Sequence, residues 1–375
     1  MGSVKQLSYA ASTRFYLEDS AKGQPWRTTL PFPVQAVATV EEIDEIANTR
    51  QVARFDNHDG YYDGTKQAFR GFGYVERWDG ELSDENAAKA DREARGLHRD
   101  DHVAPAYGRT WFHTGAPGQG GRPSDHYRSP YVGAQGKSLG HYYQGVSGDL
   151  HLLDSLPESG GGQLSDLDIA ESCRALGGQR LRQEIYAWHG PETRDAPGVP
   201  FLVREQRFRL RSLQPPHQTR PGVFALFSVE DLTCHYEQQA RDPRIEHRFS
   251  LETDRLGNVT KSCVVHYPRR EAAPDPATPP PASQTDTRAT AIVTRFFDPL
   301  DDDHDYLFGV PAEERQFELS LNAVMPATGL ITRDAIVTAT DGLRPEGTAV
   351  DGFPPTFGVG AALLLGQDPL GVHQR

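Results

Sequence analysis

Histidines and acidic residues are the side chains of this sequence whose types and spacing could do chemistry. The chain has 14 histidines, and His58 lies in the sequence NHDG beside Asp56 and Asp59. An imidazole and two carboxylates could serve as ligands of a metal ion. The surrounding residues have the character of a β-hairpin, in which consecutive side chains point to opposite faces and at most alternate residues converge. We therefore predict no metal site at His58.

A second acidic cluster lies late in the chain. It is the run Asp301, Asp302, Asp303, His304 and Asp305. Such a run resembles a cation-binding loop, but it lacks the glycine and the distal bidentate glutamate of an EF-hand. The pattern is more typical of a solvated acidic turn, so we predict no metal site there either.

Candidates for catalysis are few. His113 follows Trp111 and Phe112 and could act as a general base, but most histidines in such a context satisfy a hydrogen bond in the core. The sequence has no GxSxG motif to supply a nucleophile, no GxGxxG after a strand and no P-loop. Paired carboxylates for glycoside hydrolysis stay open, because their separation is a three-dimensional quantity. We predict no catalytic residue, no cofactor-binding residue and no cofactor.

An arginine row at Arg207, Arg209 and Arg211 could face nucleic acid or an acidic partner. The formal net charge of −13 argues against a nucleic-acid binder, because the binding face of such proteins is basic. In an acidic chain, a row of this kind is more typical of a solvated strand face that balances neighbouring carboxylates.

The elements that would position these residues are mostly strands. The segment Arg54–Asp79 combines aromatic residues with two Asp-Gly pairs, at 59–60 and 63–64. Asp-Gly between residues of strand character predicts a hairpin turn, because glycine accepts the positive φ that a tight turn demands. Gly71 and Gly73 indicate places where another backbone or a ring packs against the strand.

The clearest predicted hairpin spans Ile245–Tyr267. A turn at Asp254–Asn258 joins two alternating segments, as expected for half-buried strands. Alternation over Val34–Val40 and Arg207–Leu213 predicts further strands. The hairpin residues that share one face are Ile245, His247, Phe249 and Leu251, and on the return Val259, Lys261, Cys263, Val265 and Tyr267.

Two helices are predicted between the strands. Ser165–Leu176 begins with a capping box of Ser165 and Asp168, and Gly177 and Gly178 end it. Asp84–Arg95 is almost wholly polar and predicts a surface helix. The flanking staple and apolar stripe predicted for the first helix are Leu164, Ile169, Ala170, Cys173 and Leu176. The fold class that follows is mainly β, with one or two short helices.

Composition agrees with a large β protein. The chain has 375 residues, of which 37% are hydrophobic. Its mean hydropathy is −0.60, and no apolar run approaches the roughly 18 residues of a membrane helix. The three cysteines, Cys173, Cys234 and Cys263, form no CxxC motif, and a reducing compartment fits them best. We expect Cys234 and Cys263, which lie in strand-like contexts, to be small buried side chains. The amino terminus lacks the features of a secretory signal peptide.

Glycine and proline mark the connections between regions. Gly115–Arg122 is glycine-rich and predicts a flexible connection, and Ala272–Thr287 is proline-rich and excludes a central strand. The regions predicted from these limits are 1–115 with hairpins, 116–271 with the capped helix near 165–176, the proline-rich linker 272–287, further strands over 288–325, and a divergent tail over 326–375 that is a candidate for disorder.

Several blocks of the sequence resemble one family in the same order along the chain. Arg54–Asp79 is similar to the tyrosine- and aspartate-rich segment in the B component of the tripartite insecticidal toxin complexes (Tc toxins), whose repeats are of the RHS/YD type. The other blocks lie between Ser12 and Tyr267, so the resemblance covers about two-thirds of the chain. They are STRFYLEDSAKGQPWRTTLPFPV from Ser12, YGRTWFHTG from Tyr107, LRQEIY from Leu181, RSLQP from Arg211, HYEQQARDPRI from His235 and LETDRLGNVTKSCVVHY from Leu251.

The resemblance implies an RHS/YD-repeat-type strip of antiparallel β-hairpins in the wall of a curved shell. In the family, B and C components build a shell that encloses a cytotoxic polypeptide and docks on a pore-forming A component. We therefore expect a non-enzymatic virulence protein whose partners are other shell chains and the enclosed toxin. It would be made in the cytoplasm without a signal peptide and exported or cell-associated within the complex. It would not bind nucleic acid or insert into a membrane.

Two further expectations concern the length of the chain and an alternative function. The chain is short for a B component, so it would be a fragment, a split-gene product or a degenerate copy. The alternative function is a carbohydrate-active or carbohydrate-binding β protein, which exposed Trp78, Trp111 and Trp188 and paired carboxylates would favour.

Overall fold

The computed structural model describes most of the chain in two compact units. Unit 1 comprises Met1–Gln144, Leu153–Leu226 and His235–Ala240, and unit 2 comprises Gly145–Leu152, Phe227–Cys234 and Arg241–Arg375. The residues described are 2–26, 28, 30–44, 46, 49–79, 106–116, 152–153, 155–157, 165–189, 193, 196–217, 220–269, 284–298, 300–301, 306–321, 324–326, 329–344 and 373–374.

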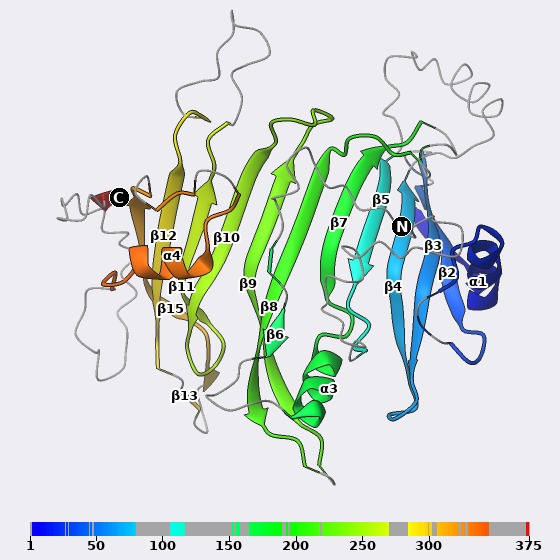
Figure 1. The fold of residues 1–375 in the computed structure, drawn as a ribbon, viewed down its shortest axis with the longest axis horizontal. Coiled ribbons are helices and arrows are strands. Elements are labelled where there is room, and N and C mark those ends of the chain that lie inside the picture. Colours follow the sequence, from blue (N-terminus) through cyan, green and yellow to red (C-terminus); the bar gives the residue numbers. More distant parts are fainter. Residues whose placement is uncertain are drawn as a thin grey trace, which may run out of the picture. The chain divides into compact units, whose positions relative to one another are not determined.

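Unit 1 is built on a sheet whose neighbouring strands follow one another along the chain (Figure 1). Each strand pairs antiparallel with the next, and the short β6 (Leu156–Pro157) adds to β8 in parallel. The antiparallel strands are β1 (Ser3–Ala11), β2 (Gln35–Asp44), β3 (Thr49–Asp63), β4 (Ala68–Asp79), β5 (Ala106–Phe112), β7 (Arg180–Ala187) and β8 (Leu202–Gln214).

The two Asp-Gly pairs have different outcomes. The pair at 63–64 lies where β3 turns into β4, as predicted. The prediction of a turn at 59–60 is wrong, because this pair lies inside β3 at an irregularity in the β3–β4 register. Asp59, not the glycine, has the positive φ, at 53°. Gly60 is required for a different reason: a Cβ there would lie 2.8 Å from the ring of Trp26.

The predictions for Gly71 and Gly73 also have different outcomes. A Cβ at Gly73 would lie 3.3 Å from the side chains of Asp59 and Thr114, so this glycine permits close packing. No atom lies within 4 Å of a Cβ placed on Gly71. That residue instead has a φ of +98°, which an L side chain rarely adopts.

The described residues of unit 1 include two helices, α1 (Ser12–Ala21) and α3 (Asp166–Ala175). The capping box of α3 is confirmed, since the Ser165 hydroxyl accepts from the Asp168 N–H at 3.1 Å and the Asp168 carboxylate accepts from the Ser165 N–H at 3.0 Å. The apolar stripe is wrong in part, because Ile169 is exposed while Glu171 is buried. The buried face of α3 makes ion pairs with the β3–β4 turn instead of packing only on an apolar core. The sequence analysis did not predict α1.

In the part of unit 2 that the structure describes, the elements are an antiparallel sheet and one helix, α4 (Arg333–Ala339). The strands in order are β10 (Arg244–Thr253), β11 (Val259–His266), β12 (Arg288–Phe296), β15 (Pro311–Leu319) and β16 (His373–Gln374). β13 (Leu300–Asp301) and β14 (Tyr306–Leu307) form a separate pair. The remaining strand, β9 (Val223–His235), gives residues 227–234 to unit 2 and its other residues to unit 1.

The predicted hairpin over Ile245–Tyr267 is confirmed as β10 and β11. His247 lies opposite Val265 and Phe249 opposite Cys263, which sets both apolar faces toward one core. In the turn, the Asp254 carboxylate accepts from the N–H groups of Leu256 and Asn258, each at 2.9 Å. The mainly-β fold class is likewise confirmed, since strands far outnumber the three helices of the described residues.

Several predictions fall partly or wholly outside the described residues. These include the helix over Asp84–Arg95, the connection over 117–122, Leu164 and most of the proline-rich segment. Residues 333–339, within the predicted tail, form α4, and the region limits themselves stay a prediction. Among the described residues, Cys234 and Cys263 are buried free thiols. No helix of the described part has both the length and the apolarity for a membrane crossing.

Candidate functional site

The register of four strands in unit 1 brings charged residues together inside the protein. Glu76 on β4 lies opposite Arg109 on β5, and Arg109 lies opposite Glu184 on β7. Arg182 on β7 lies opposite Glu205 on β8. These five side chains, which we call the buried charged row, are at most 4% exposed. Negative and positive charges alternate along it, which offsets part of the cost of burying each one.

Tyrosine hydroxyls complete the hydrogen bonds at the Glu76 end of the row. Glu76 accepts from the hydroxyl of Tyr74 at 2.9 Å and from that of Tyr107. The Tyr107 oxygen in turn accepts from Arg109 Nε at 2.9 Å. Burial, together with the nearby Glu76 charge, raises the pKa of both tyrosines above the ordinary value. Both hydroxyls therefore keep their protons and act as donors to the carboxylate.

The other end of the row is held by one arginine between two carboxylates. Arg182 Nε donates to Glu184 at 2.7 Å, and Arg182 Nη1 donates to Glu205 on the neighbouring strand. Glu184 also accepts from the Tyr186 hydroxyl at 2.6 Å. A guanidinium can bind two carboxylates at once because its N–H groups form a rigid, planar fork.

Aromatic rings flank the charged row on both sides. Tyr74 stacks on Trp111 with ring centroids 5.0 Å apart, and Trp78 stacks on Tyr107 at 5.5 Å. The guanidinium of Arg109 lies 5.3 Å from the Tyr107 ring centroid, within the range of a cation–π contact. The rings exclude water from the charged row, and this strengthens its electrostatic interactions.

At the β3 edge of the row, His58 connects it to α1. Nδ1 of His58 lies 2.6 Å from the Asp19 carboxylate of α1, and Nε2 lies 3.5 Å from Glu76, which is an ion-pair distance rather than a close hydrogen bond. Burial by itself lowers the pKa of the imidazole. The contacts with Asp19 and Glu76 outweigh burial and raise that pKa to about 9. At neutral pH His58 is therefore a buried cation between two carboxylates.

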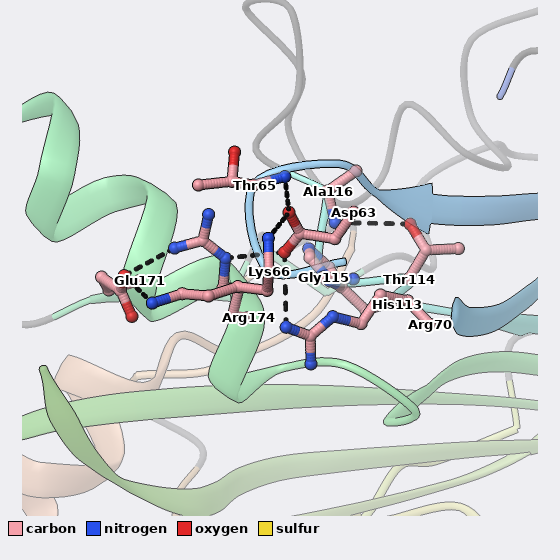
Figure 2. A network of polar contacts seen from close by, with 10 residues as sticks. All are labelled: Asp63, Thr65, Lys66, Arg70, His113, Thr114, Gly115, Ala116, Glu171 and Arg174. Carbon is pink, nitrogen blue, oxygen red and sulfur yellow. Dashed lines mark hydrogen bonds and ion pairs between the residues drawn. The ribbon is translucent and has the colours of Figure 1, made fainter. Parts of the chain in front are cut away.

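A second polar network joins the β3–β4 turn to α3 (Figure 2). The Asp63 carboxylate accepts from Arg174 Nε at 2.8 Å and from Arg70 Nη2 at 3.3 Å. Arg174 Nη1 also donates to Glu171 at 2.6 Å, and Lys66 Nζ lies 3.3 Å from Glu171. Burial acts to raise the pKa of Asp63, but the hydrogen bonds from Arg174 and from backbone N–H groups lower it overall.

The chain after β5 packs closely on the same end of α3. A Cβ on Gly115 would lie 3.4 Å from the Arg174 Cα atom, and Gly115 has a φ of +81°. The Gly115 N–H donates to Nδ1 of His113 at 2.9 Å. His113 is buried, so the prediction that it satisfies a core hydrogen bond is confirmed.

The charged partners of His58 are Asp19 and Glu76, and not its sequence neighbours Asp56 and Asp59. Within the described part of the chain, no group of three histidine, cysteine or acidic side chains could hold a metal ion. Of the acidic run after residue 300, only Asp301 is described, in β13.

The tryptophans do not form an exposed binding surface. Trp78 and Trp111 are buried, and Trp188 is half-buried against Trp78 and Tyr107. Unit 2 has a pocket of about 460 Å³ whose lining includes Glu252, Asp254 and Lys261, but none of the tryptophans. These observations give no support to the carbohydrate alternative.

The buried charged row was missed by the sequence analysis, although a signal was present. In each of three strands, a buried charged residue has a buried residue two positions before it and another two positions after it. The segments are YVERW from Tyr74, YGRTW from Tyr107 and RQEIY from Arg182, and the charged residue is the middle one of each. Alternate residues of a strand share a face. A charge flanked at this spacing by aromatic residues therefore indicates a charge buried with them.

The described elements define a mainly β protein with a buried charged row, and the comparisons with known proteins show its family. Residues 1–114 match the insecticide toxin TcdB middle/N-terminal region, and residues 171–298 match the insecticide toxin TcdB middle/C-terminal region. The chain belongs to the B components of the Tc toxins. No curated protein sequence matches it.

Solved structures of Tc toxins are similar over most of the chain. A crystal structure of TcdB2-TccC3-Cdc42 matches with 25% identity and a TM-score of 0.65 over 88% of this chain. A Photorhabdus luminescens Tc holotoxin pore with a substituted TccC3 matches with 26% identity and a TM-score of 0.67 over 91%. In both cases this chain spans 15% of the length of the solved chain.

Proposed function

We propose that this chain forms part of the sheet wall of a shell that encloses a cytotoxic polypeptide. The observation that carries the proposal is the similarity of 88% of the chain to a structure that contains a TcdB and a TccC protein together. The sequential order of antiparallel strands in unit 1 supports it, because such a strip extends a wall by one hairpin at a time.

The buried charged row suits a wall better than a reaction site. Its side chains are closed off from solvent, Arg182 is hydrogen-bonded to Glu184 and Glu205, and the Tyr107 hydroxyl joins Glu76 to Arg109, so a substrate could not reach them. Hydrogen-bonded charges across β4, β5, β7 and β8 favour one strand register, because a slip by one residue would place each charge on the opposite face. We infer that the chain is not an enzyme and that its polar interior fixes the geometry of the wall.

The partners follow from the same proposal. They are a C-component chain, further B-component segments and the enclosed polypeptide, with a pore-forming A component contacted through the assembled complex. Support comes from the TcdB–TccC structures and from the holotoxin pore. The chain would act as part of an exported or cell-associated complex.

Co-expression with a C-component chain and the remaining B-component segments tests the proposal. We expect the chain to co-purify with both and the enclosed polypeptide to resist added protease. A matched pair of variants sharpens the test: Gly73→Val inserts a side chain where Asp59 and Thr114 leave 3.3 Å, whereas Gly64→Val has open space. Loss of protease protection only in the first variant is expected, and a chain that co-purifies with neither partner would refute the proposal.

Single polar residues should matter only through stability. We expect His58→Ala, His113→Ala and Asp303→Ala to retain the enclosed polypeptide wherever the variant folds. Substitutions at Phe69 and Phe72 should reduce retention, because Phe72 packs in the sheet core beside Trp26 and Phe69 packs on Phe72. A well-folded His113→Ala protein that loses a measurable enzymatic activity would instead favour an enzyme.

A further inference from the structure

The Asp19 carboxylate links α1 to the sheet of unit 1. The Asp19 side chain accepts from the indole N–H of Trp26 at 2.7 Å and pairs with Nδ1 of His58 at 2.6 Å. The apolar contact is small, because only Phe15 of α1 is a buried hydrophobic residue. The helix also lacks a side-chain cap at its N-cap residue, Ala11. The polar link between α1 and His58 therefore holds α1 in place together with the hydrogen bonds between Ser12 and Val34 and the edge-to-face contact of Tyr16 with Trp26.

The number of donors on His58 decides whether this link is complete. A doubly protonated imidazole has two N–H donors, one directed at Asp19 and one at Glu76. A neutral imidazole has one donor and one acceptor. After loss of a proton, one ring nitrogen presents its lone pair to a carboxylate, and the attraction between the imidazole charge and both carboxylates is lost.

The other charged groups around His58 do not replace the lost proton. Those on the packed elements are Asp19 and Arg14 of α1, Asp56 of β3, Tyr74 and Glu76 of β4, and, beyond Glu76, Tyr107 and Arg109 of β5. The pKa of Tyr74 and of Tyr107 is raised by burial first of all. Both hydroxyls therefore stay protonated in mildly alkaline solution. Arg14 is paired with Glu18 on the exposed side of the helix.

We propose that Asp19, His58 and Glu76 form a pH-sensitive contact that holds α1 on the sheet at neutral pH and releases it in alkaline solution. This contact goes beyond the role of the chain as part of a shell wall, because it makes the docking of α1 on unit 1 depend on the pH of the solution. The direction of the pH effect follows from the linkage between protonation of His58 and docking of α1. A group whose pKa is higher in the docked state stabilises docking fully below its free value, and the stabilisation is lost as the pH rises through the docked value.

The size of the effect follows from the two pKa values. His58 has a pKa of about 9 when docked, against 6.5 for a free imidazole. The docking equilibrium of α1 should then weaken about 70-fold between pH 7 and pH 10, if undocking exposes His58 fully to water.

Hydrogen exchange of the full chain, read by mass spectrometry, tests the proposal. Protection factors of the α1 amides, corrected for the intrinsic rate at each pH, should fall by one to two orders of magnitude between pH 7 and pH 10. In His58→Gln, which cannot titrate, α1 should be less protected at pH 7 and its protection should change little with pH. The matched control is His113→Gln, a second buried histidine of unit 1, which should keep the wild-type pH response.

A second measurement keeps the proposal testable if His58→Gln does not fold. The ring proton resonance of His58 in the wild-type protein should titrate above pH 8 in an NMR experiment. A titration below pH 7 would overturn the proposal. So would α1 protection that is constant from pH 7 to pH 10, or a decline of the same size in a folded His58→Gln protein.

Discussion

Replacing the buried arginine of the charged row should cost far more stability than replacing an exposed arginine in the same local arrangement. The substitution is Arg182→Met, which keeps most of the side-chain volume and removes the charge and the N–H donors. Arg182 contacts Glu184 two residues along β7 and Glu205 on β8. Methionine leaves both carboxylates buried without the cation that neutralises them.

The structure supplies a control in which burial is the main difference. Arg77 Nε lies 2.7 Å from Asp79 two residues along β4, and Arg182 Nε lies at the same distance from Glu184. The side chains of the first pair are 55% and 44% exposed, and those of the second are 1% and 0% exposed. Breaking a buried ion pair by removing one partner costs about 3–5 kcal/mol. An exposed pair is worth about 0–1 kcal/mol. Arg182→Met should therefore remove a large share of a typical unfolding free energy of about 5–15 kcal/mol.

Urea unfolding followed by tryptophan fluorescence measures this difference in unit 1 alone. All four tryptophans of the chain belong to unit 1, so unit 2 does not contribute to the signal. The midpoint should drop strongly for Arg182→Met and little for Arg77→Met. Adding Glu205→Gln to Arg182→Met should recover part of the loss, since it removes one of the unneutralised charges. Equal costs for the two arginine variants would refute the reasoning that the row is a buried, electrostatically coupled unit.

Three further outcomes follow from other contacts of unit 1. Ser165→Ala should cost about 1 kcal/mol through loss of the helix cap, seen as a lower denaturation midpoint. Gly60→Ala should cost about 1–3 kcal/mol because its Cβ meets an indole ring at 2.8 Å, whereas Gly64→Ala, in open space, should be nearly neutral. Arg174→Met should destabilise the protein at pH 7. The difference from wild type should shrink as the pH falls through the lowered pKa of Asp63, because that carboxylate then protonates in both proteins; a difference that persists at pH 2 would contradict this assignment.

Local patterns were enough to predict the elements that depend on local chemistry. The period-two alternation of Ile245–Tyr267 and the capping box at Ser165 each act within a few residues, and both appear as predicted. Helix α1 was missed because it offers no such signal: it has no side-chain cap, and two of its buried residues, Ser12 and Asp19, are polar.

The sequence of each strand indicates that a charged residue is buried there. It does not predict which charged residues of neighbouring strands lie opposite each other in the buried charged row. Glu76 meets Arg109, and Arg182 meets Glu205, across strands whose alignment is set by the whole sheet. The same holds for His58. Its nearest acidic residues in the sequence, Asp56 and Asp59, are not its ion-pair partners, because Asp19 reaches it from a helix 39 residues earlier.

The boundary between the two family matches has a consequence for the integrity of the chain. β5 lies in the first match and β7 in the second, yet the two strands pair directly, and Asp63 binds Arg174 across 111 residues. A single cut by a protease between residues 117 and 150 would therefore sever the backbone while leaving this strand pair and this ion pair in place. The two pieces should stay together through purification and separate only in denaturant, so that a nicked protein would look intact by every measurement except its mass under denaturing conditions.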